Sequence, residues 1–109
     1  MFAVIYRGFI LPEHEQAYRQ AWREIADYFV QHAGALGSTL HKTPAGEYIA
    51  YSRWPDKATR DRYWDEQGNL QTVAGLNETI ATLKMAIDRN KPYDEIAMEV
   101  VDETEKKIP

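Results

Sequence analysis

The chain contains no cysteine among its 109 residues, which excludes disulfides and thiolate chemistry. It has no apolar run near the roughly 18–20 residues that a membrane helix requires, so we expect no membrane association. The formal charge is −4 without a basic face, and nucleic acid is therefore not an expected partner. The first residues lack the basic region and cleavage site of a secretion signal, which makes a cytoplasmic location the default expectation.

Aromatic residues are abundant for a chain of this size, with 3 Trp, 7 Tyr and 3 Phe. Hydrophobic residues make up 44% and charged residues 28% of the chain, as in an ordinary folded protein. We therefore expect a single domain over residues 1–109, with a charged tail from about residue 103. Its many rings require a core, a partner subunit or the wall of a pocket.

Hydrophobic periodicity predicts strands and helices in alternation along the chain. The expected strands are Phe2–Phe9, Gly37–Thr43, Glu47–Trp54 and Tyr93–Asp102. A long helix follows Pro12 and stops near Gly34, with Tyr18, Ala21, Trp22, Ile25 and Phe29 on its apolar stripe. Asp56 is expected to cap a short helix over Ala58–Trp64. A last helix is expected to carry Val73, Leu76, Ile80, Leu83 and Ile87 on one side.

This order of elements predicts an α+β fold, the ferredoxin-like β-α-β-β-α-β arrangement with a four-stranded antiparallel sheet. Right-handed crossovers place both helical segments on one face of the sheet. The other face would then expose apolar and aromatic side chains, which soluble monomers rarely keep. We therefore expect a homodimer that covers this open face with a second copy. Arg7 and Glu99 are expected to form a cross-strand pair on neighbouring strands.

Turn chemistry at Pro44-Ala45-Gly46 predicts a hairpin. Thr43 faces Glu47 in the regular hairpin, whereas a bulge at Gly46 would shift the pairing by one residue. Alternation then groups His41, Tyr51 and Arg53 on one face of the hairpin. Histidine titrates near ~6.5, so His41 and Tyr51 are candidates for moving a proton. An edge-strand or dimer-interface cluster explains the same grouping. The alternation does not determine which face of the sheet carries it.

Several segments resemble the dimeric α/β-barrel superfamily, and within it the antibiotic biosynthesis monooxygenase type. The residues that carry the resemblance are Val4-Ile5-Tyr6-Arg7-Gly8, Tyr48-Ile49-Ala50-Tyr51-Ser52-Arg53-Trp54, and the segment from Trp54-Pro55-Asp56-Lys57-Ala58 to Trp64. The resemblance covers roughly residues 2 to 102. It implies a pocket between sheet and helices in each subunit, where cofactor-free oxygenases act on phenols or quinol-like substrates.

A related branch of this superfamily degrades haem, and the match to that branch is incomplete. Trp64 corresponds to the tryptophan that this branch carries on its short helix. Its strand asparagine falls near Tyr6 in this chain, and its histidine falls near Ala74, which cannot ligate iron. Haem degradation is therefore disfavoured. The three histidines also lack the spacing of a zinc site, so we expect neither metal nor any other cofactor.

Three side chains near the short and last helices have two interpretations each. Trp64 either fills the core or lines a pocket and stacks on a flat ligand. Arg60 lies on a solvated helix face or at a pocket mouth. Asn77 is either a satisfied polar group in the core or a donor to a pocket.

We therefore expect a monooxygenase-like enzyme that acts on a small aromatic or quinol-like molecule without metal or flavin. The expected pocket residues are Tyr6, Trp22, Trp54, Arg60, Trp64 and Asn77. Tyr51 or His41 would handle the proton. The alternative is a dimer that binds a small molecule, or serves as a stress-response accessory protein, and catalyses nothing.

Overall fold

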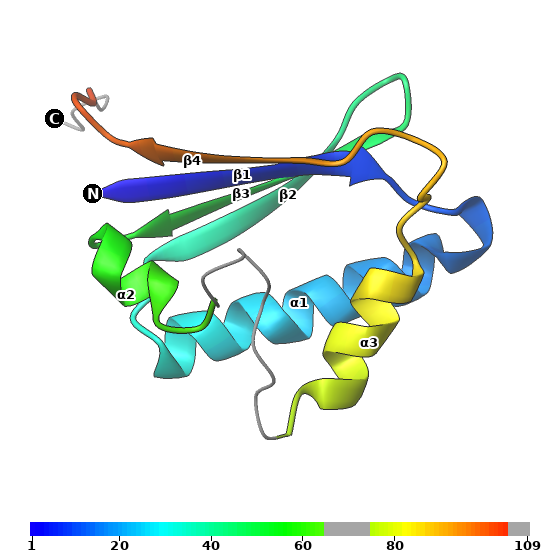
Figure 1. Ribbon diagram of the computed structural model, residues 1–109, viewed down its shortest axis with the longest axis horizontal. Coiled ribbons are helices and arrows are strands. Elements are labelled where there is room, and N and C mark those ends of the chain that lie inside the picture. Colours follow the sequence, from blue (N-terminus) through cyan, green and yellow to red (C-terminus); the bar gives the residue numbers. More distant parts are fainter. Residues whose placement is uncertain (65–74, 105–109) are drawn as a thin grey trace, which may run out of the picture.

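A computed structural model describes residues 1–64 and 75–104 of the chain. Figure 1 shows a curved sheet with its helices gathered on one side. The elements in chain order are β1 (Phe2–Phe9), η1 (Pro12–His14), α1 (Glu15–His32), β2 (Gly37–Lys42), β3 (Glu47–Trp54), α2 (Lys57–Asp61), α3 (Asn77–Met85) and β4 (Asp94–Glu99). The expected residues Val73 and Ala74 lie outside the described part.

All strand pairs are antiparallel, in the order β2-β3-β1-β4. This order and the placement of the helices confirm the predicted ferredoxin-like α+β fold. The sheet remains open within the chain, and β2 and β4 form its two edges. No helix of the described ranges is both long and apolar enough to cross a membrane.

Side-chain alternation decides which face of the sheet the helices cover. Val4 lies opposite Ser52 on β3 and Ala97 on β4, and these positions face the helices. Val4 is fully buried, and Trp54 is only 1% exposed. Both belong to a core cluster that includes Phe29 of α1. The stripe on α1 is confirmed by its buried residues, Tyr18, Ala21, Ile25 and Phe29.

The β2–β3 hairpin has the predicted register, with Thr39 opposite Tyr51 and His41 opposite Ile49. The Thr43 amide donates to the Glu47 carbonyl over 2.8 Å. Gly46 closes the turn with φ +89°, a conformation that favours glycine. His41 and Tyr51 therefore share the face that points away from the helices.

Three elements end two or more residues earlier than predicted. Asp56 caps α2 by accepting from the Thr59 amide over 2.7 Å, yet the helix stops at Asp61 and Trp64 lies beyond it. On α3, the chain leaves the helix before Ile87, which instead bridges Ile10 beside β1. The end of β4 is set by its partner strand, because β1 begins at Phe2, and only one further backbone hydrogen bond follows, from the Val100 amide to the Met1 carbonyl over 2.9 Å.

The predicted Arg7–Glu99 pair is wrong. Arg7 lies opposite Asp94 on β4, while Glu99 lies opposite Phe2 at the other end of the strand. Arg7 instead forms an exposed ion pair with Glu47, with 3.1 Å between Nη2 and Oε1. The sequence correctly predicted that β1 and β4 are neighbours, but only the strand register shows which of their residues lie opposite each other.

Candidate functional site

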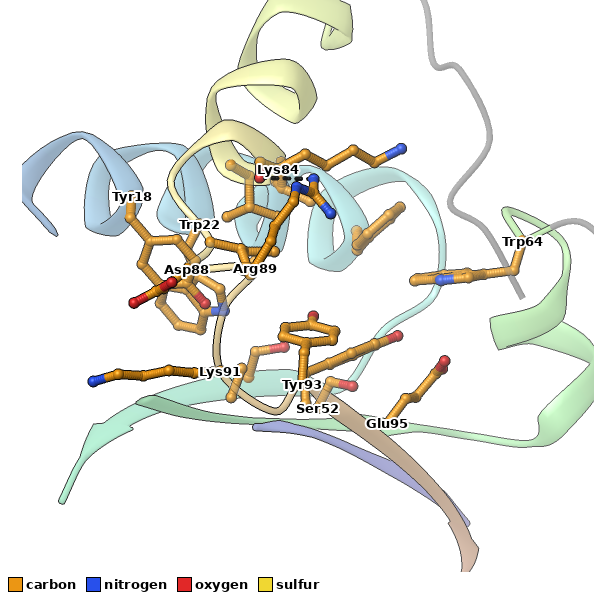
Figure 2. Close-up of a pocket in the computed structure, with 18 residues that line it drawn as sticks. Tyr18, Trp22, Ser52, Trp64, Lys84, Asp88, Arg89, Lys91, Tyr93 and Glu95 are labelled. Carbon is orange, nitrogen blue, oxygen red and sulfur yellow. Dashed lines mark hydrogen bonds between the residues drawn. The ribbon is translucent and has the colours of Figure 1, made fainter. Parts of the chain in front are cut away.

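A cavity of about 600 Å³ lies between the sheet and the helices. This volume is within the usual range for pockets that hold small molecules. All four strands contribute its floor, and α1, α3, the segment before β4 and Trp64 contribute its walls (Figure 2). The lining residues with rings or polar side chains are Tyr6, Tyr18, Trp22, Phe29, Ser38, Ser52, Trp64, Lys84, Asp88, Arg89, Lys91, Tyr93 and Glu95.

Trp64 forms part of both the core and the cavity wall. Its ring centroid lies 5.3 Å from that of Phe29 and 6.0 Å from that of Trp54, in a perpendicular contact with the latter. The side chain is half-buried. Both interpretations of Trp64 therefore hold for the same ring: one side packs, and the cavity has access to another.

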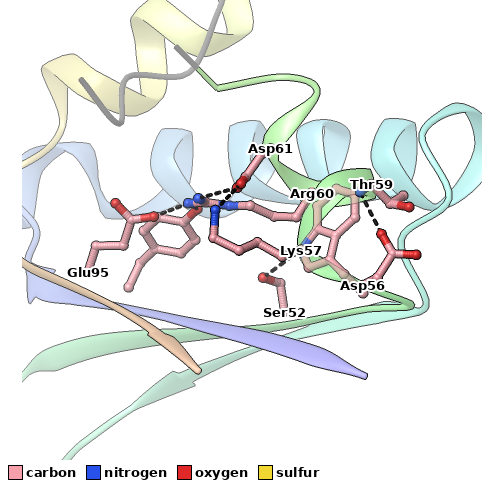
Figure 3. A network of polar contacts seen from close by, with 9 residues as sticks. Ser52, Asp56, Lys57, Thr59, Arg60, Asp61 and Glu95 are labelled. Atoms are coloured by element: carbon pink, nitrogen blue, oxygen red, sulfur yellow. Dashed lines mark hydrogen bonds and ion pairs between the residues drawn. The ribbon is translucent and has the colours of Figure 1, made fainter. Parts of the chain in front are cut away.

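A buried arginine, Arg60, contacts three residues at the Trp64 end of the cavity, and Figure 3 shows its ion pair with Glu95. Arg60 is 7% exposed, and its Nη2 donates to the Tyr6 hydroxyl over 2.9 Å. The same nitrogen donates to Oε1 of Glu95. The guanidinium carbon lies 4.3 Å from the centroid of the Trp64 ring. Arg60 thus fixes a phenol, a carboxylate and an indole relative to one another.

Burial raises the pKa of the Tyr6 phenol far above its ordinary value, although the Arg60 hydrogen bond partly opposes this shift. Burial likewise raises the pKa of Tyr93 to about 12, with a further increase from the charge of Glu95. Both phenols are therefore protonated at neutral pH. Tyr6 presents a neutral hydroxyl group that can donate a hydrogen bond.

The opposite end of the cavity is charged. Lys84, Asp88, Arg89 and Lys91 reach it from the end of α3 and the segment before β4 (Figure 2). Arg89 is held by a 3.2 Å hydrogen bond from Nη2 to the Lys84 carbonyl, and Lys91 Nζ lies 4.6 Å from the centroid of the Phe9 ring. This segment thus contributes three cationic residues and one carboxylate to the cavity's lining, although the Lys91 ammonium points away from the cavity.

The predicted site residues divide into three groups. Tyr6, Trp22 and Trp64 line the cavity. Arg60 does not line it but contacts Tyr6, Glu95 and Trp64, which do. The remaining expected residues, Trp54, Asn77, His41 and Tyr51, lie elsewhere.

Each of these four has a physical reason for its position. Trp54 is enclosed by the core. Asn77 is the exposed first residue of α3, so it is neither a core amide nor a cavity donor. Register places His41 and Tyr51 across the sheet from the cavity. Neither of the latter two can therefore handle a proton there within one subunit.

Glu95 and Tyr93 were missed in the sequence. Alternation along the last strand separates Ile96 and Met98 from Glu95 and Ala97, but it does not show which set faces the helices. The register does, because Glu95 lies opposite Tyr6. Glu95 could have been recognised as a site residue from one signal, a carboxylate on the strand face that packs against aromatic rings. In the described ranges, no group of three His, Cys, Asp or Glu residues is placed to hold a metal ion.

Known structures share this fold over nearly the whole chain. A candidate antibiotic biosynthesis monooxygenase from Deinococcus radiodurans is 17% identical, with a TM-score of 0.70 and coverage of 98% of this chain and 99% of that one. A Caulobacter crescentus protein of the same description is 10% identical, with a TM-score of 0.72 and coverage of 93% and 90%. SnoaB, a cofactor-independent oxygenase from Streptomyces nogalater, is 12% identical, with a TM-score of 0.69 and coverage of 96% and 97%.

At these identities the structural likeness shows the fold alone. A search of curated protein sequences finds no match. The model of one protein family, described as antibiotic biosynthesis monooxygenase, matches residues 1–72. This match covers more than half of the chain and includes β1, α1, β2, β3, α2 and Trp64. The chain therefore belongs to the antibiotic biosynthesis monooxygenase family.

Proposed function

We propose that this protein is a monooxygenase that oxidises a small, electron-rich aromatic molecule without metal or flavin. The observation that carries the proposal is the cavity of about 600 Å³ with Trp64, Phe29 and Tyr6 in its lining. Rings in the wall of a pocket favour a flat ligand through offset or edge-to-face contacts. Family membership and the described activity of SnoaB support the same chemistry.

In this reaction the substrate itself supplies the electrons. An anthrone-type ring carbon gives up two hydrogen atoms and gains one oxygen atom from dioxygen as a carbonyl. The second oxygen atom leaves with those two hydrogen atoms as water. The protein's part is to exclude bulk water, hold the ring against Trp64 and donate a hydrogen bond from Tyr6 to a substrate oxygen that gains negative charge.

The test is oxygen uptake by the purified protein with a panel of phenols, anthrones and quinols. We expect uptake above the uncatalysed rate with at least one compound. Tyr6→Phe should lower that rate because it removes the donor, on the order of 10²-fold if the hydrogen bond forms mainly in the transition state. Tyr48→Phe is the matched control, since Tyr48 is buried on the same sheet face but does not line the cavity. No uptake with any compound would refute the proposal.

A binding protein without catalysis is the second candidate. One observation favours it: none of the three histidines lines the cavity in the described part of the chain, so the usual acid–base side chain is missing there. Such a protein would be stabilised by its ligand, as mass action requires, without consuming oxygen. Thermal unfolding with the same panel separates the two candidates.

The open face of the sheet supports a homodimer as part of this proposal. Ile5, Ile49, Tyr51, Ile96 and Met98 alternate onto this face, and Ile96 is 42% exposed. Sedimentation should give twice the chain mass of 12.6 kDa. Ile96→Asp should shift the protein toward monomer because it places a charge in an apolar interface. A wild-type monomer at micromolar concentration would contradict the dimer.

The cytoplasmic location stays a prediction.

A further inference from the structure

Glu95 and Tyr6 lie side by side in the cavity, although they come from different strands. They are direct cross-strand partners on β4 and β1, and both line the cavity. Arg60 Nη2 donates to both, which holds the phenol oxygen and the carboxylate close to one nitrogen. Figure 2 shows Glu95 rising from the sheet toward Trp64. The two groups are thus fixed in relative position by a residue that is itself buried.

Each group keeps hydrogen-bonding capacity after it has bonded to Arg60. Oε1 of Glu95 accepts from Arg60, and Oε2 has no protein donor within the described ranges. The Tyr6 oxygen accepts from Arg60, and its own O–H has no protein acceptor there. One acceptor and one donor therefore remain next to each other. A hydroxyl group complements both, because it donates one hydrogen bond and accepts others.

We infer that Glu95 accepts the O–H proton of an aromatic alcohol bound in the cavity, with Arg60 as the residue that positions it. This inference rests on the proposed function for the identity of the cavity's ligand. In the bound state the ligand hydroxyl donates to Glu95 and accepts from Tyr6. During reaction its O–H bond breaks and an O–H bond to Glu95 forms. The negative charge moves from the carboxylate to the ligand oxygen, and no electron is transferred in this step.

The charges around Glu95 favour a neutral hydroxyl over a preformed phenolate. The Arg60 guanidinium offsets one carboxylate charge, and Asp61 binds the same guanidinium through Nη1. Lys57 pairs with Asp61 through Oδ2, so these nearby charges nearly cancel. A phenolate would still place its anionic oxygen against the Glu95 carboxylate without a hydrogen to donate, whereas a neutral hydroxyl group can donate one. The other titratable groups that line the same cavity are Tyr18 of α1, Lys84 of α3, Asp88, Arg89 and Lys91 of the next segment, Tyr93 before β4 and Tyr6 of β1.

The test compares the binding of 2-naphthol and 2-methoxynaphthalene by calorimetry or fluorescence in the absence of oxygen. Both ligands present the same rings, but only the naphthol can donate to Glu95. Wild type should prefer 2-naphthol by roughly tenfold or more, as expected for a hydrogen bond to a charged acceptor. Glu95→Gln should remove most of that preference, because an amide accepts more weakly than a carboxylate.

Glu99→Gln is the matched control variant. Glu99 lies on the same strand and the same sheet face, but it does not line the cavity. This variant should keep the wild-type preference. Equal affinities of wild type for the two ligands would overturn the inference without any variant, as would failure to bind 2-naphthol. An unchanged preference in folded Glu95→Gln would overturn it as well.

A double-mutant cycle tests the positioning role of Arg60. Arg60→Met should reduce the preference for 2-naphthol when Glu95 is present and have little further effect beside Glu95→Gln. A purely structural arginine would weaken both ligands alike, and that result would refute the positioning role. The proposed function fails separately: a naphthol preference with no oxygen uptake from any compound would leave Glu95 as a binding residue in a protein that does not catalyse.

Discussion

Two tryptophans that touch each other should differ in their contributions to stability. Trp54 is 1% exposed and packs against Phe29 at 5.6 Å between ring centroids. Truncation of such a ring to alanine costs ~3–5 kcal/mol. Trp64 is only partly buried, so its loss forfeits part of the ~1.5–3 kcal/mol that a fully buried large side chain contributes. The Arg60 contact adds ~0.5–1 kcal/mol. We therefore expect Trp64→Ala to cost ~2 kcal/mol.

Urea unfolding followed by far-UV circular dichroism measures both costs at one fixed protein concentration. If Trp54→Ala leaves too little folded protein to measure, Trp54→Phe serves as a milder variant, because the free energy of unfolding of such domains is only ~5–15 kcal/mol. Affinity for 2-naphthol should fall in Trp64→Ala and persist in Trp54→Phe. Equal costs for the two alanine variants, or a larger cost for Trp64, would refute the assignment of Trp64 to a cavity wall.

Three further predictions concern Tyr6, Asp56 and Gly8. Burial raises the pKa of Tyr6, so its contribution to stability is complete below about pH 10 and is lost as pH rises through the raised value; Tyr6→Phe should reduce the alkaline fall in melting temperature. The Thr59 amide lowers the pKa of Asp56, so the Asp56 carboxylate's contribution to stability is lost as pH falls through the lowered value. The melting temperature of Asp56→Asn should therefore fall less than that of wild type as the solution is made acidic. A Cβ at Gly8 would lie 2.5 Å from Cδ2 of Tyr93, so Gly8→Ala should cost ~1–3 kcal/mol in urea unfolding; an unchanged value would mean that the ring moves aside freely.

The strands with continuous partners were the most predictable part of the fold. The bounds of β1 and β3 match the alternation in the sequence, and both strands pair on two sides. The end of β4 depends on where β1 begins, which no local pattern contains. The same is true of Arg7, whose ionic partner is set by register.

The candidate site was predictable only in part, because alternation assigns residues to two faces without saying which face meets the helices. Tyr6 and Trp64 were placed by the family resemblance, and both line the cavity. His41 and Tyr51 were predicted as candidates for moving a proton, but they lie on the sheet face opposite the cavity. Glu95 was overlooked, since its position beside Tyr6 follows from strand register and its contact with Arg60 from tertiary packing.

A crystal structure of the protein soaked with 2-naphthol tests the account most directly. It should show the ligand between the sheet and α1, with its rings against Trp64 and its hydroxyl oxygen within hydrogen-bond distance of both Tyr6 and Glu95. Naphthol bound elsewhere on the protein, with this cavity filled by rearranged side chains, would contradict the account.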